Sequence, residues 1–579
     1  MSTLDIADVP TTKEPIASGG IEVQAQDSSD AASINTPAQA GVQDIEAVTT
    51  VWSTKALVFA YVLIWITYFV EGMLSGTNAA LAPFVTSTYA DHALTPTVSI
   101  LSAIIGGVTN FTIAKMLDVW GRPQGFAVCV IIATIGLVMM AKTQSVEMYA
   151  AAQVFYAVGN NGLQYTLSVF VADTSSLHNR GLMQAFAYSP NMITCWLAGP
   201  ISTAFLDDNG PGWHWAFGMF AFLVPAVTLP LFGLIIFHHN KAKRQLALPT
   251  QQGSRTVLQS ALHYFHEFDA VGSFTLWRCG TVPTAFQSLH HPSNRLVITT
   301  HHLSFGVWRR TTDRFRHMGA LFARITFIPY ALLKNRTILG ACFLSATLFF
   351  SYFVWNSYFS SFLLVVNDLS VTNASYVVQI YTVGSVLASI AVGILIHYTG
   401  RFKPVTLYFA VPLSILGTGL MIYFRTPDGY IGYIVMCQIF IAFAAGTIII
   451  CDEIAILACV QHQHIAAVLA ALGLFGNVGG AIGLTVAAAI WQGVFPQRLL
   501  QYLPDDALDN FLLIYGDLST QLSYEVGSPT RIAIQQAYGD AQTDMLIAAT
   551  AVWAFGLVAV LLWRDIKVTG VKQVKGHVV

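Results

Sequence analysis

The chain has 579 residues, of which 55% are hydrophobic and 10% are charged, and its formal net charge is −2. This composition excludes a soluble domain of such length and predicts an all-α, polytopic membrane protein embedded in a lipid bilayer. The nearly neutral charge argues against a nucleic-acid partner. The seven cysteines lie in or beside apolar runs, so they predict neither a disulfide framework nor a metal site.

The first half of the chain begins with a polar segment and continues with apolar runs. Residues 1–52 are rich in serine, threonine, alanine, glutamine and acids, so we expect a disordered tail there. Residues 53–237 then hold six runs typical of membrane-spanning helices. The predicted spans are 55–78, 98–117, 126–141, 148–171, 182–205 and 213–237.

A short charged hinge, AKMLDVWGRPQGF (residues 114–126), separates the second and third spans. A connection this short makes the two helices antiparallel neighbours. We expect Asp118 to end one helix, Gly121 to permit the turn, and Arg122 to lie at the water boundary. Asp118 and Arg122 are interpreted as a conformational latch outside the substrate site. The alternative is an ordinary basic connector on the cytosolic side.

A weaker copy of this hinge, GILIHYTGRFK, lies at residues 393–403, where Gly400 and Arg401 recur and His397 stands in the place of the acid. Two hinges in matching places predict two homologous halves. The second half, residues 336–565, holds six further runs. They lie at 339–366, 377–398, 405–424, 431–459, 465–491 and 545–563.

Charge separates the two sides of the predicted bundle. Basic residues gather at one set of helix ends, so we expect that side, with both termini and the tail 566–579, to be cytosolic in the plasma membrane. An endosomal or vesicular membrane is the alternative. The other side carries an acidic loop, 496–543. We predict that its tyrosines gate the entry of solute, the alternative being a passive connector; they are Tyr502, Tyr515, Tyr524 and Tyr538.

Residues 238–335 form the predicted cytosolic linker between the halves, and the stretch 271–320 within it breaks the pattern. It contains six arginines, no lysine and five of the sixteen histidines. Codons can be chosen for two of its segments so that reading one base later gives apolar runs. We therefore hypothesise that 271–320 is translated out of frame, and the alternative is a genuine basic insertion.

Several stretches resemble the fungal siderophore–iron transporters of the major facilitator superfamily, most closely the ferric triacetylfusarinine importers. Besides the first hinge, they are NGLQYTLSVFVADTSSLHNRGLM (161–183), YFSSFLLVVNDLSVTNASYV (358–377), YIVMCQIFIAFAAGTIIICDEIAILA (433–458) and GGAIGLTVAAAIWQGVFP (479–496). The resemblance implies a major facilitator fold with two pseudo-repeated six-helix halves. Relatives carry fourteen helices, and the extra pair would fall at 271–320 and be lost here.

The resemblance also implies a function. It indicates a transporter, with no enzymatic activity and no cofactor, that imports a ferric hydroxamate siderophore together with protons. We expect a monomer. A drug or toxin exporter of the same superfamily is an alternative, although WLAGPIST (196–203) lacks the glycines that flank Gly-Pro in exporters. A non-transporting nutrient sensor is a further alternative.

Proton coupling requires an ionisable group in the transport path, and acids within spans are the candidates. They are Glu71, Asp452 and Glu453. Adjacent residues cannot share one helix face. We favour Asp452 because relatives carry a glutamate at its position. The alternatives are an interfacial place for Glu71 and an ion pair with a neighbouring helix for Asp452.

Amides and aromatic rings suit a bulky, nearly neutral ferric hydroxamate better than a charged clamp does. Two groups of such residues lie within predicted spans, and for each member the alternative is simple packing between helices. These cavity candidates are Asn160, Asn161, Gln164, Tyr165, Tyr352, Trp355, Asn356 and Tyr358.

Overall fold

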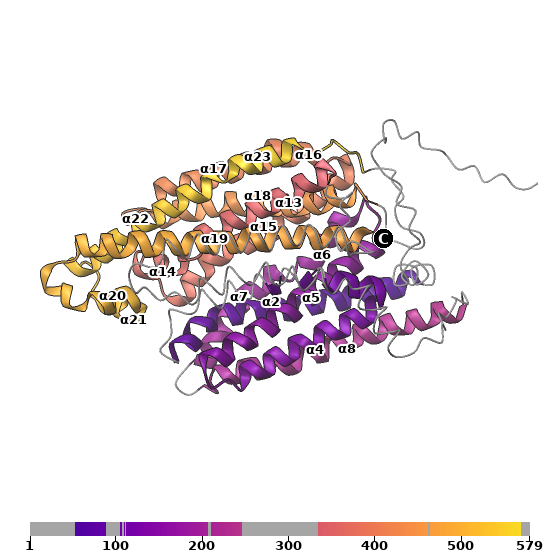
Figure 1. Cartoon of the computed structure of the whole chain (residues 1–579), viewed down its shortest axis with the longest axis horizontal. Helices are drawn as coiled ribbons and strands as arrows, with labels where there is room; N and C mark the ends of the chain where they lie inside the picture. Colours follow the sequence, from indigo (N-terminus) through magenta and orange to yellow (C-terminus); the bar gives the residue numbers. More distant parts are fainter. Residues whose placement is uncertain are drawn as a thin grey trace, which may run out of the picture. The chain divides into compact units, whose positions relative to one another are not determined.

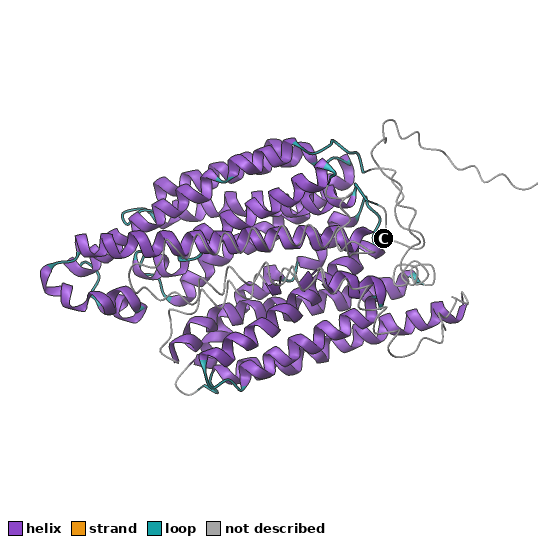
Figure 2. Cartoon of the chain, viewed as in Figure 1, coloured by secondary structure: helices purple, strands orange, loops and turns teal. Residues whose placement is uncertain are grey.

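The computed structural model describes residues 52–88, 105–106, 109–110, 112–206, 210–245, 334–460 and 464–568. Within these ranges every regular element is a helix (Figure 2). The predicted tail before Trp52, the stretch 271–320 and most of the tail 566–579 lie outside the described residues.

The helices of the first half follow the order of the predicted spans (Figure 1). They are α2 (Thr54–Thr88), a helical segment that ends at Val119, α4 (Arg122–Ala141), α5 (Val146–Thr174), α6 (Arg180–Tyr188), α7 (Asn191–Leu206) and α8 (Trp213–Gln245). The fifth predicted span is broken between α6 and α7, where Pro190 supplies no backbone N–H. α8 extends beyond prediction, so residues 238–245 are helical and not part of a loop.

The second half contains α13 (Arg336–Asn356), α14 (Phe359–Val365), α15 (Val371–Thr399), α16 (Lys403–Val405), the π-helical turn η2 (Thr406–Ala410) and α17 (Val411–Phe424). It continues with α18 (Ile431–Leu457), α19 (Ile465–Tyr502), η4 (Asp505–Asn510), α20 (Phe511–Gly516), α21 (Leu518–Ser523), α22 (Pro529–Ala551) and α23 (Trp553–Leu561). α14 continues the seventh span after a short break.

The predicted loop 496–543 is wrong at both of its ends. α19 continues to Tyr502, and α22 begins at Pro529, where the Ser528 side chain accepts a hydrogen bond of 3.2 Å from the backbone N–H of Arg531. Ser528 is therefore a helix N-cap, and Pro529 occupies the first turn that tolerates proline. The segment between the helices shrinks to residues 503–528, which we call the outer loop, and even this contains η4, α20 and α21.

Among the described residues, nine helical stretches are long and apolar enough to cross a membrane. α5 is not one of them, although it has 29 residues, because its middle carries polar side chains that lower its mean hydropathy. These include Gln153, Asn160, Asn161 and Gln164. Polar side chains within a spanning helix face the protein interior or a water-filled path, so the exception directs attention to α5.

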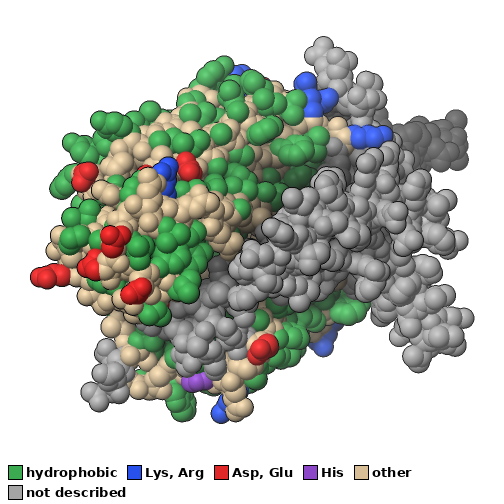
Figure 3. Space-filling model, turned by 60° about the vertical axis from the view of Figure 1, so that its left-hand side comes forward, with side chains coloured by type: hydrophobic (Ala, Val, Ile, Leu, Met, Phe, Trp, Pro, Cys, Tyr) green, Lys and Arg blue, Asp and Glu red, His purple; other side chains and the backbone are tan. Residues whose placement is uncertain are grey.

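The two ends of the bundle differ in charge. Basic residues begin or end helices at what we call the basic end, and they include Arg122, Arg180, Arg244, Arg336 and Lys403. The opposite, acidic end carries Glu147, Asp428, Asp505, Asp506 and Glu525. Figure 3 shows hydrophobic side chains over much of the visible described surface, with most acidic groups at the left, where a basic group also lies, and several lysine or arginine side chains at the upper right. Such an apolar surface suits burial in a bilayer.

Candidate functional site

The first hinge holds a buried ion-pair network. Arg122 is 3% exposed and contacts two carboxylates: Nη1 lies 2.8 Å from Asp118 Oδ1, and Nε lies 3.0 Å from Asp173 Oδ2 at the end of α5. Gly121 has φ of 101°, a conformation that favours glycine, and it makes the turn into α4. The expectation that Arg122 lies at the water boundary is therefore wrong, because its partners keep it buried. Asp173 was not singled out in the sequence because it lies 51 residues from Arg122.

The second hinge is built differently. Gly400 has φ of 66° and ends α15 in the left-handed conformation. Arg401 is 59% exposed, and its Nη1 lies 3.7 Å from Asp565 Oδ2, which is also exposed. His397, in the place of the acid, shares a hydrogen bond of 2.7 Å between its Nδ1 and Asn179 Oδ1 of the first half. This hinge thus lacks the buried network and instead contacts the other half.

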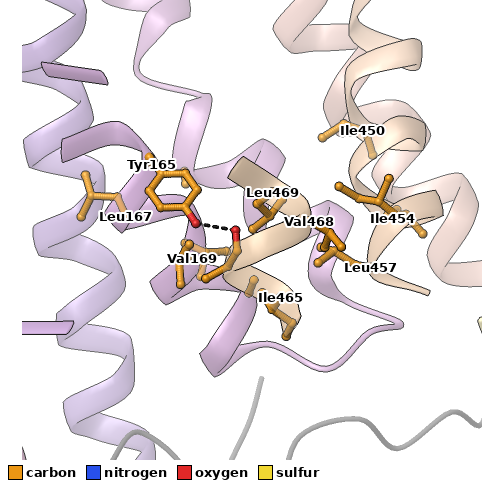
Figure 4. Packing of buried hydrophobic residues seen from close by; sticks show 14 of the residues in the cluster. Tyr165, Leu167, Val169, Ile450, Ile454, Leu457, Ile465, Val468 and Leu469 are labelled. Carbon is orange, nitrogen blue, oxygen red and sulfur yellow. Dashed lines mark hydrogen bonds between the residues drawn. The ribbon is translucent and has the colours of Figure 1, made fainter. Parts of the chain in front are cut away.

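The two halves share one hydrophobic core at the basic end. The cluster joins Tyr61, Leu167 and Val169 of the first half to Ile454 and Leu469 of the second. Figure 4 shows side chains from both halves facing each other, with the Tyr165 hydroxyl donating a hydrogen bond of 2.5 Å to the Ala466 carbonyl. The basic end is therefore closed in this structure.

Toward the acidic end the hydrophobic cores of the halves are separate. The first half forms a cluster that includes Leu74, Leu137 and Phe217, and the second half forms one around Trp491. α7 and α15 nevertheless stay in contact there, with the rings of Trp196 and Tyr376 5.1 Å apart. The two halves thus share one hydrophobic core at the basic end, whereas toward the acidic end each half has a core of its own.

Glu71 is buried near the middle of α2. Its Oε2 atom has no hydrogen-bond partner among the residues that the structure describes. The helix passes close to α7 beside it, since a Cβ added to Gly72 would lie 2.5 Å from the side chains of Asn191 and Thr194. An interfacial Glu71 would be exposed, so burial argues against the snorkelling alternative and for a place inside the protein.

Asp452 and Glu453 face different partners. Asp452 is buried, interacts electrostatically with Cys342 of α13 in its own half, and has an Oδ1 atom without a partner among the described residues. Glu453 is partly buried, and its Oε1 accepts a hydrogen bond of 3.3 Å from Gln184 Nε2 of α6. Successive helix residues point about 100° apart, and here Glu453 is the one that contacts the other half.

Polar side chains connect Glu453 with the interior of the first half. Gln184 Nε2 also lies within 3.5 Å of the Tyr188 hydroxyl and bonds to Ser168. The ring of Tyr188 makes an edge contact with that of Tyr68, one turn before Glu71 on α2, at 5.1 Å between centroids. Tyr68 interacts electrostatically with both Glu453 and Glu71. A row of amide and phenol groups thus runs from Glu453 to Tyr68, three residues before Glu71 on α2.

The cavity candidates fall into two sets. On α5, Asn160 is buried with an unpartnered Oδ1 among the described residues, and Asn161 lies against Gly106. Gln164 is half-buried, and its backbone carbonyl accepts a 3.3 Å hydrogen bond from the Tyr68 hydroxyl. Tyr165 instead forms the inter-half bond to Ala466, so it belongs to the closed basic end.

The aromatic candidates pack within the second half. Trp355 is buried among Phe359 and Tyr381, so packing explains it. Asn356 donates a hydrogen bond of 3.1 Å to the Tyr352 hydroxyl. The ring of Tyr358 stacks on that of Trp491, with 4.2 Å between their centroids.

The four tyrosines predicted as an outer gate do not lie together on the outer loop. Tyr538 is buried on α22, against Trp491 and Phe495. Tyr502 ends α19, and its hydroxyl donates a 2.8 Å hydrogen bond to Asp540. Tyr515 and Tyr524 are the members that belong to the outer loop, and both are partly buried.

The sequence matches the Major Facilitator Superfamily over residues 64–484, and the chain belongs to this superfamily. It is similar over nearly its whole length to fungal proteins. The MFS siderochrome iron transporter 1 of Ajellomyces capsulatus is 52% identical, over 96% of this chain and 94% of that protein. The MFS siderochrome iron transporter D of Aspergillus fumigatus is 41% identical, over 94% and 90%. The siderophore iron transporter mirB of Emericella nidulans is 39% identical, over 97% and 93%.

A solved structure shares the fold. The crystal structure of the human organic anion transporter MFSD10 (TETRAN) matches with a TM-score of 0.51 at 11% identity, and the match covers 85% of this chain and 98% of that chain. At this identity the likeness supports the fold alone. Together these comparisons confirm the predicted resemblance, the all-helical major facilitator fold and the membership of a non-enzymatic transporter family.

Proposed function

We propose that this chain imports a ferric siderophore by alternating access and couples the import to protons. The observation that carries the proposal is the near full-length similarity to a siderochrome iron transporter at 52% identity. The amide-rich face of α5 supports a substrate that is bulky and close to neutral, such as a ferric hydroxamate. The iron enters as cargo held by its chelator, so the protein itself needs to recognise only the chelate.

We infer the orientation of the chain in the membrane from its charge distribution. Cytosolic loops of membrane proteins carry an excess of lysine and arginine, so the basic end is the cytosolic one and the acidic end faces the medium. The shared core closes the basic end, so in this state solute would have to enter from the acidic end. We place the chain in the plasma membrane, with both termini in the cytosol, as a monomer.

Glu453 is the acid best placed to couple protons to the movement of the halves. It lies on α18 but bonds to Gln184 on the opposite half, beside the core that closes the basic end. Opening that end must break this contact and admit water to the carboxyl group. Because hydration and hydrogen bonding control the protonation of a carboxyl group, the protonation of Glu453 is tied to the conformational state.

Neutral replacements of the two adjacent acids test this assignment. Glu453→Gln should keep surface expression and substrate binding but lose uphill, pH-dependent uptake, because the amide cannot carry a proton between the two states. Asp452→Asn is the matched control, because Asp452 is buried one residue away and no described hydrogen bond joins it to the other half. If Asp452→Asn loses pH-dependent accumulation and Glu453→Gln keeps it, the coupling acid is Asp452, as the sequence alone favoured.

The substrate itself is tested by radio-iron uptake in a yeast host that lacks its own siderophore importers. Cells that express the chain should accumulate iron from at least one ferric hydroxamate, in competition with the unlabelled chelate, and should not accumulate iron supplied as a simple salt. Uptake equal to that of the empty host for every siderophore in the panel would overturn the proposal.

A further inference from the structure

The first half of α22 carries a row of polar side chains on one face. Arg531, Gln535, Tyr538 and Gln542 follow one another at intervals of four, three and four residues, the spacing of a single helix face. Arg531, Tyr538 and Gln542 are buried. Polar side chains inside a membrane protein need partners, and those of Arg531, Gln535 and Tyr538 are found at α14 and on the outer loop.

Arg531 is the unusual member. Only 1% of it is exposed, and it lies in the first turn of α22, where the helix dipole disfavours a positive charge. Asp368 Oδ1 is 3.8 Å from Nη2, too far for a hydrogen bond, and its side chain is 63% exposed. This distant, hydrated carboxylate does not by itself account for the burial of the guanidinium.

The guanidinium is held mainly by backbone carbonyl groups from two separate segments. Nε donates to the Val365 carbonyl at 3.1 Å and Nη2 to the Leu364 carbonyl at 3.4 Å, both in the last turn of α14. Nη1 donates to the Gln521 carbonyl of α21 at 2.6 Å. Carbonyls in the last turn of a helix lack partners within it, so a single side chain caps two helices.

Its neighbours in the row each serve one of these two segments. Gln535 Nε2 donates to the carbonyls of Val365 and Val366, both at 3.2 Å, and so contacts only the α14 side. The Tyr538 hydroxyl donates to Gln521 Oε1 at 2.8 Å on the α21 side. Gln521 in turn donates to the Ile514 carbonyl of α20 at 2.7 Å, which extends the contact through the outer loop.

We propose that Arg531 is a positioning residue that couples the outer loop to α14 by holding both on the first turn of α22, so that these segments move as one unit. α14 is the separate outer segment of the seventh span, and the outer loop lies beyond it at the acidic end. A solute that contacts the loop would thereby shift α14. This last consequence rests on the proposed function, whereas the mechanical coupling does not.

Hydrogen exchange of the purified full-length chain, read by mass spectrometry, tests the coupling without any solute. Arg531→Gln should speed exchange at both α14 and α21 by about tenfold or more, because each loses a charged donor. Gln535→Ala should affect α14 alone, and Tyr538→Phe α21 alone. The matched control is Arg498→Gln, since Arg498 is exposed near the end of α19 and bonds to Gln501 and Asp540; it should change neither segment.

Arg531→Lys keeps the charge but loses the planar fork of donors, so it should give a smaller acceleration at both segments. It also supplies the test if Arg531→Gln is not recovered as folded protein. Acceleration confined to one segment, or absent from both, in the Arg531 variants would overturn the coupling.

Uptake measurements then test its role in transport. Arg531→Gln should raise the half-saturation constant for ferric siderophore while the maximal rate per surface molecule holds, and Arg531→Lys should restore part of the loss. A lower maximal rate with an unchanged half-saturation constant would assign Arg531 a purely structural role. Absence of uptake by the unsubstituted chain would refute the proposed function and leave the exchange result standing.

Discussion

Removal of the Arg122 guanidinium should destabilise the protein strongly. Asp173 is fully buried, and Arg122 Nε lies 3.0 Å from it. Breaking a buried ion pair by deleting one partner costs about 3–5 kcal/mol, because an uncompensated charge stays behind. Arg180 also interacts electrostatically with Asp173, so we expect Arg122→Gln to cost about 3 kcal/mol, the lower limit of this range.

The second hinge supplies the matched control. Arg401 is 59% exposed and its contact to Asp565 is 3.7 Å long, and surface pairs of this kind contribute about 0–1 kcal/mol. Arg401→Gln should therefore leave stability nearly unchanged. The double variant Arg122→Gln/Asp173→Asn should recover much of the lost stability, since it removes the buried charge together with its partner.

Thermal inactivation in detergent, followed by size-exclusion chromatography of the fluorescently tagged chain, orders these variants. The expected order of stability is unsubstituted and Arg401→Gln highest, then the double variant, then Arg122→Gln. Two results would contradict this prediction: Arg122→Gln as stable as Arg401→Gln, or a double variant no more stable than Arg122→Gln. Either would show that loss of the Arg122 guanidinium does not leave a destabilising buried charge on Asp173.

Three further predictions concern other parts of the chain. Glu71→Gln should weaken proton coupling or substrate binding less than Glu453→Gln does, because no described hydrogen bond joins Glu71 to the other half. If uptake kinetics are unchanged at every pH, the buried Glu71 carboxyl takes no part in coupling or binding. Replacing Tyr515 and Tyr524 together by alanine should raise the half-saturation constant at constant maximal rate, and a change in expression alone would favour a passive connector. The uptake assay can be run at pH 5 without disturbing the outer loop. Hydrogen bonds from Thr520 and from the backbone of α21 lower the pKa of Asp517 below its usual 3.8, so the Asp517 carboxylate that caps α21 remains ionised at pH 5. This cap is lost only in stronger acid. For residues 271–320, sequencing of the transcript should reveal a one-base difference that opens near residue 272 and closes near residue 323; a transcript that encodes the printed residues would exclude the frameshift.

Hydropathy and the hinge motif were enough to predict the order of the helices. Apart from 98–117, part of which lies outside the described residues, the apolar runs of both halves match observed helices, because a bilayer requires long apolar segments whose backbone is satisfied internally. The superfamily could also be recognised from short stretches such as the first hinge. Hydropathy and the hinge motif are both patterns of neighbouring residues, so they can be read from the sequence without knowledge of the fold.

The errors arose where a helix is stabilised by partners far away in the sequence. α22 begins sixteen residues before the predicted span at 545, because its early turns carry Arg531, Gln535 and Tyr538, whose polarity resembles a loop until their partners on α14 and α21 are known. Pro529 after Ser528 was a local signal of the helix start that hydropathy concealed.

The same limit applies to the candidate site. Position in the sequence does not tell which of the adjacent acids, Asp452 or Glu453, contacts the other half. The hydrogen bond from Gln184, 269 residues away from Glu453, distinguishes them. Arg122 was placed at the water boundary for the same reason, since its partner Asp173 ends a different helix. Long-range polar contacts of this kind cannot be read from the local sequence, although they distinguish neighbouring charged residues in the fold.

The central claim, proton-coupled import of a ferric siderophore, is tested most directly in proteoliposomes that contain the purified chain and an imposed pH gradient. The measured quantity is the radio-iron accumulated inside from an external ferric hydroxamate. The account predicts accumulation above the external concentration when the outside is acidic, and collapse to equilibration when a protonophore is added. Accumulation that ignores both the pH gradient and the protonophore would contradict it.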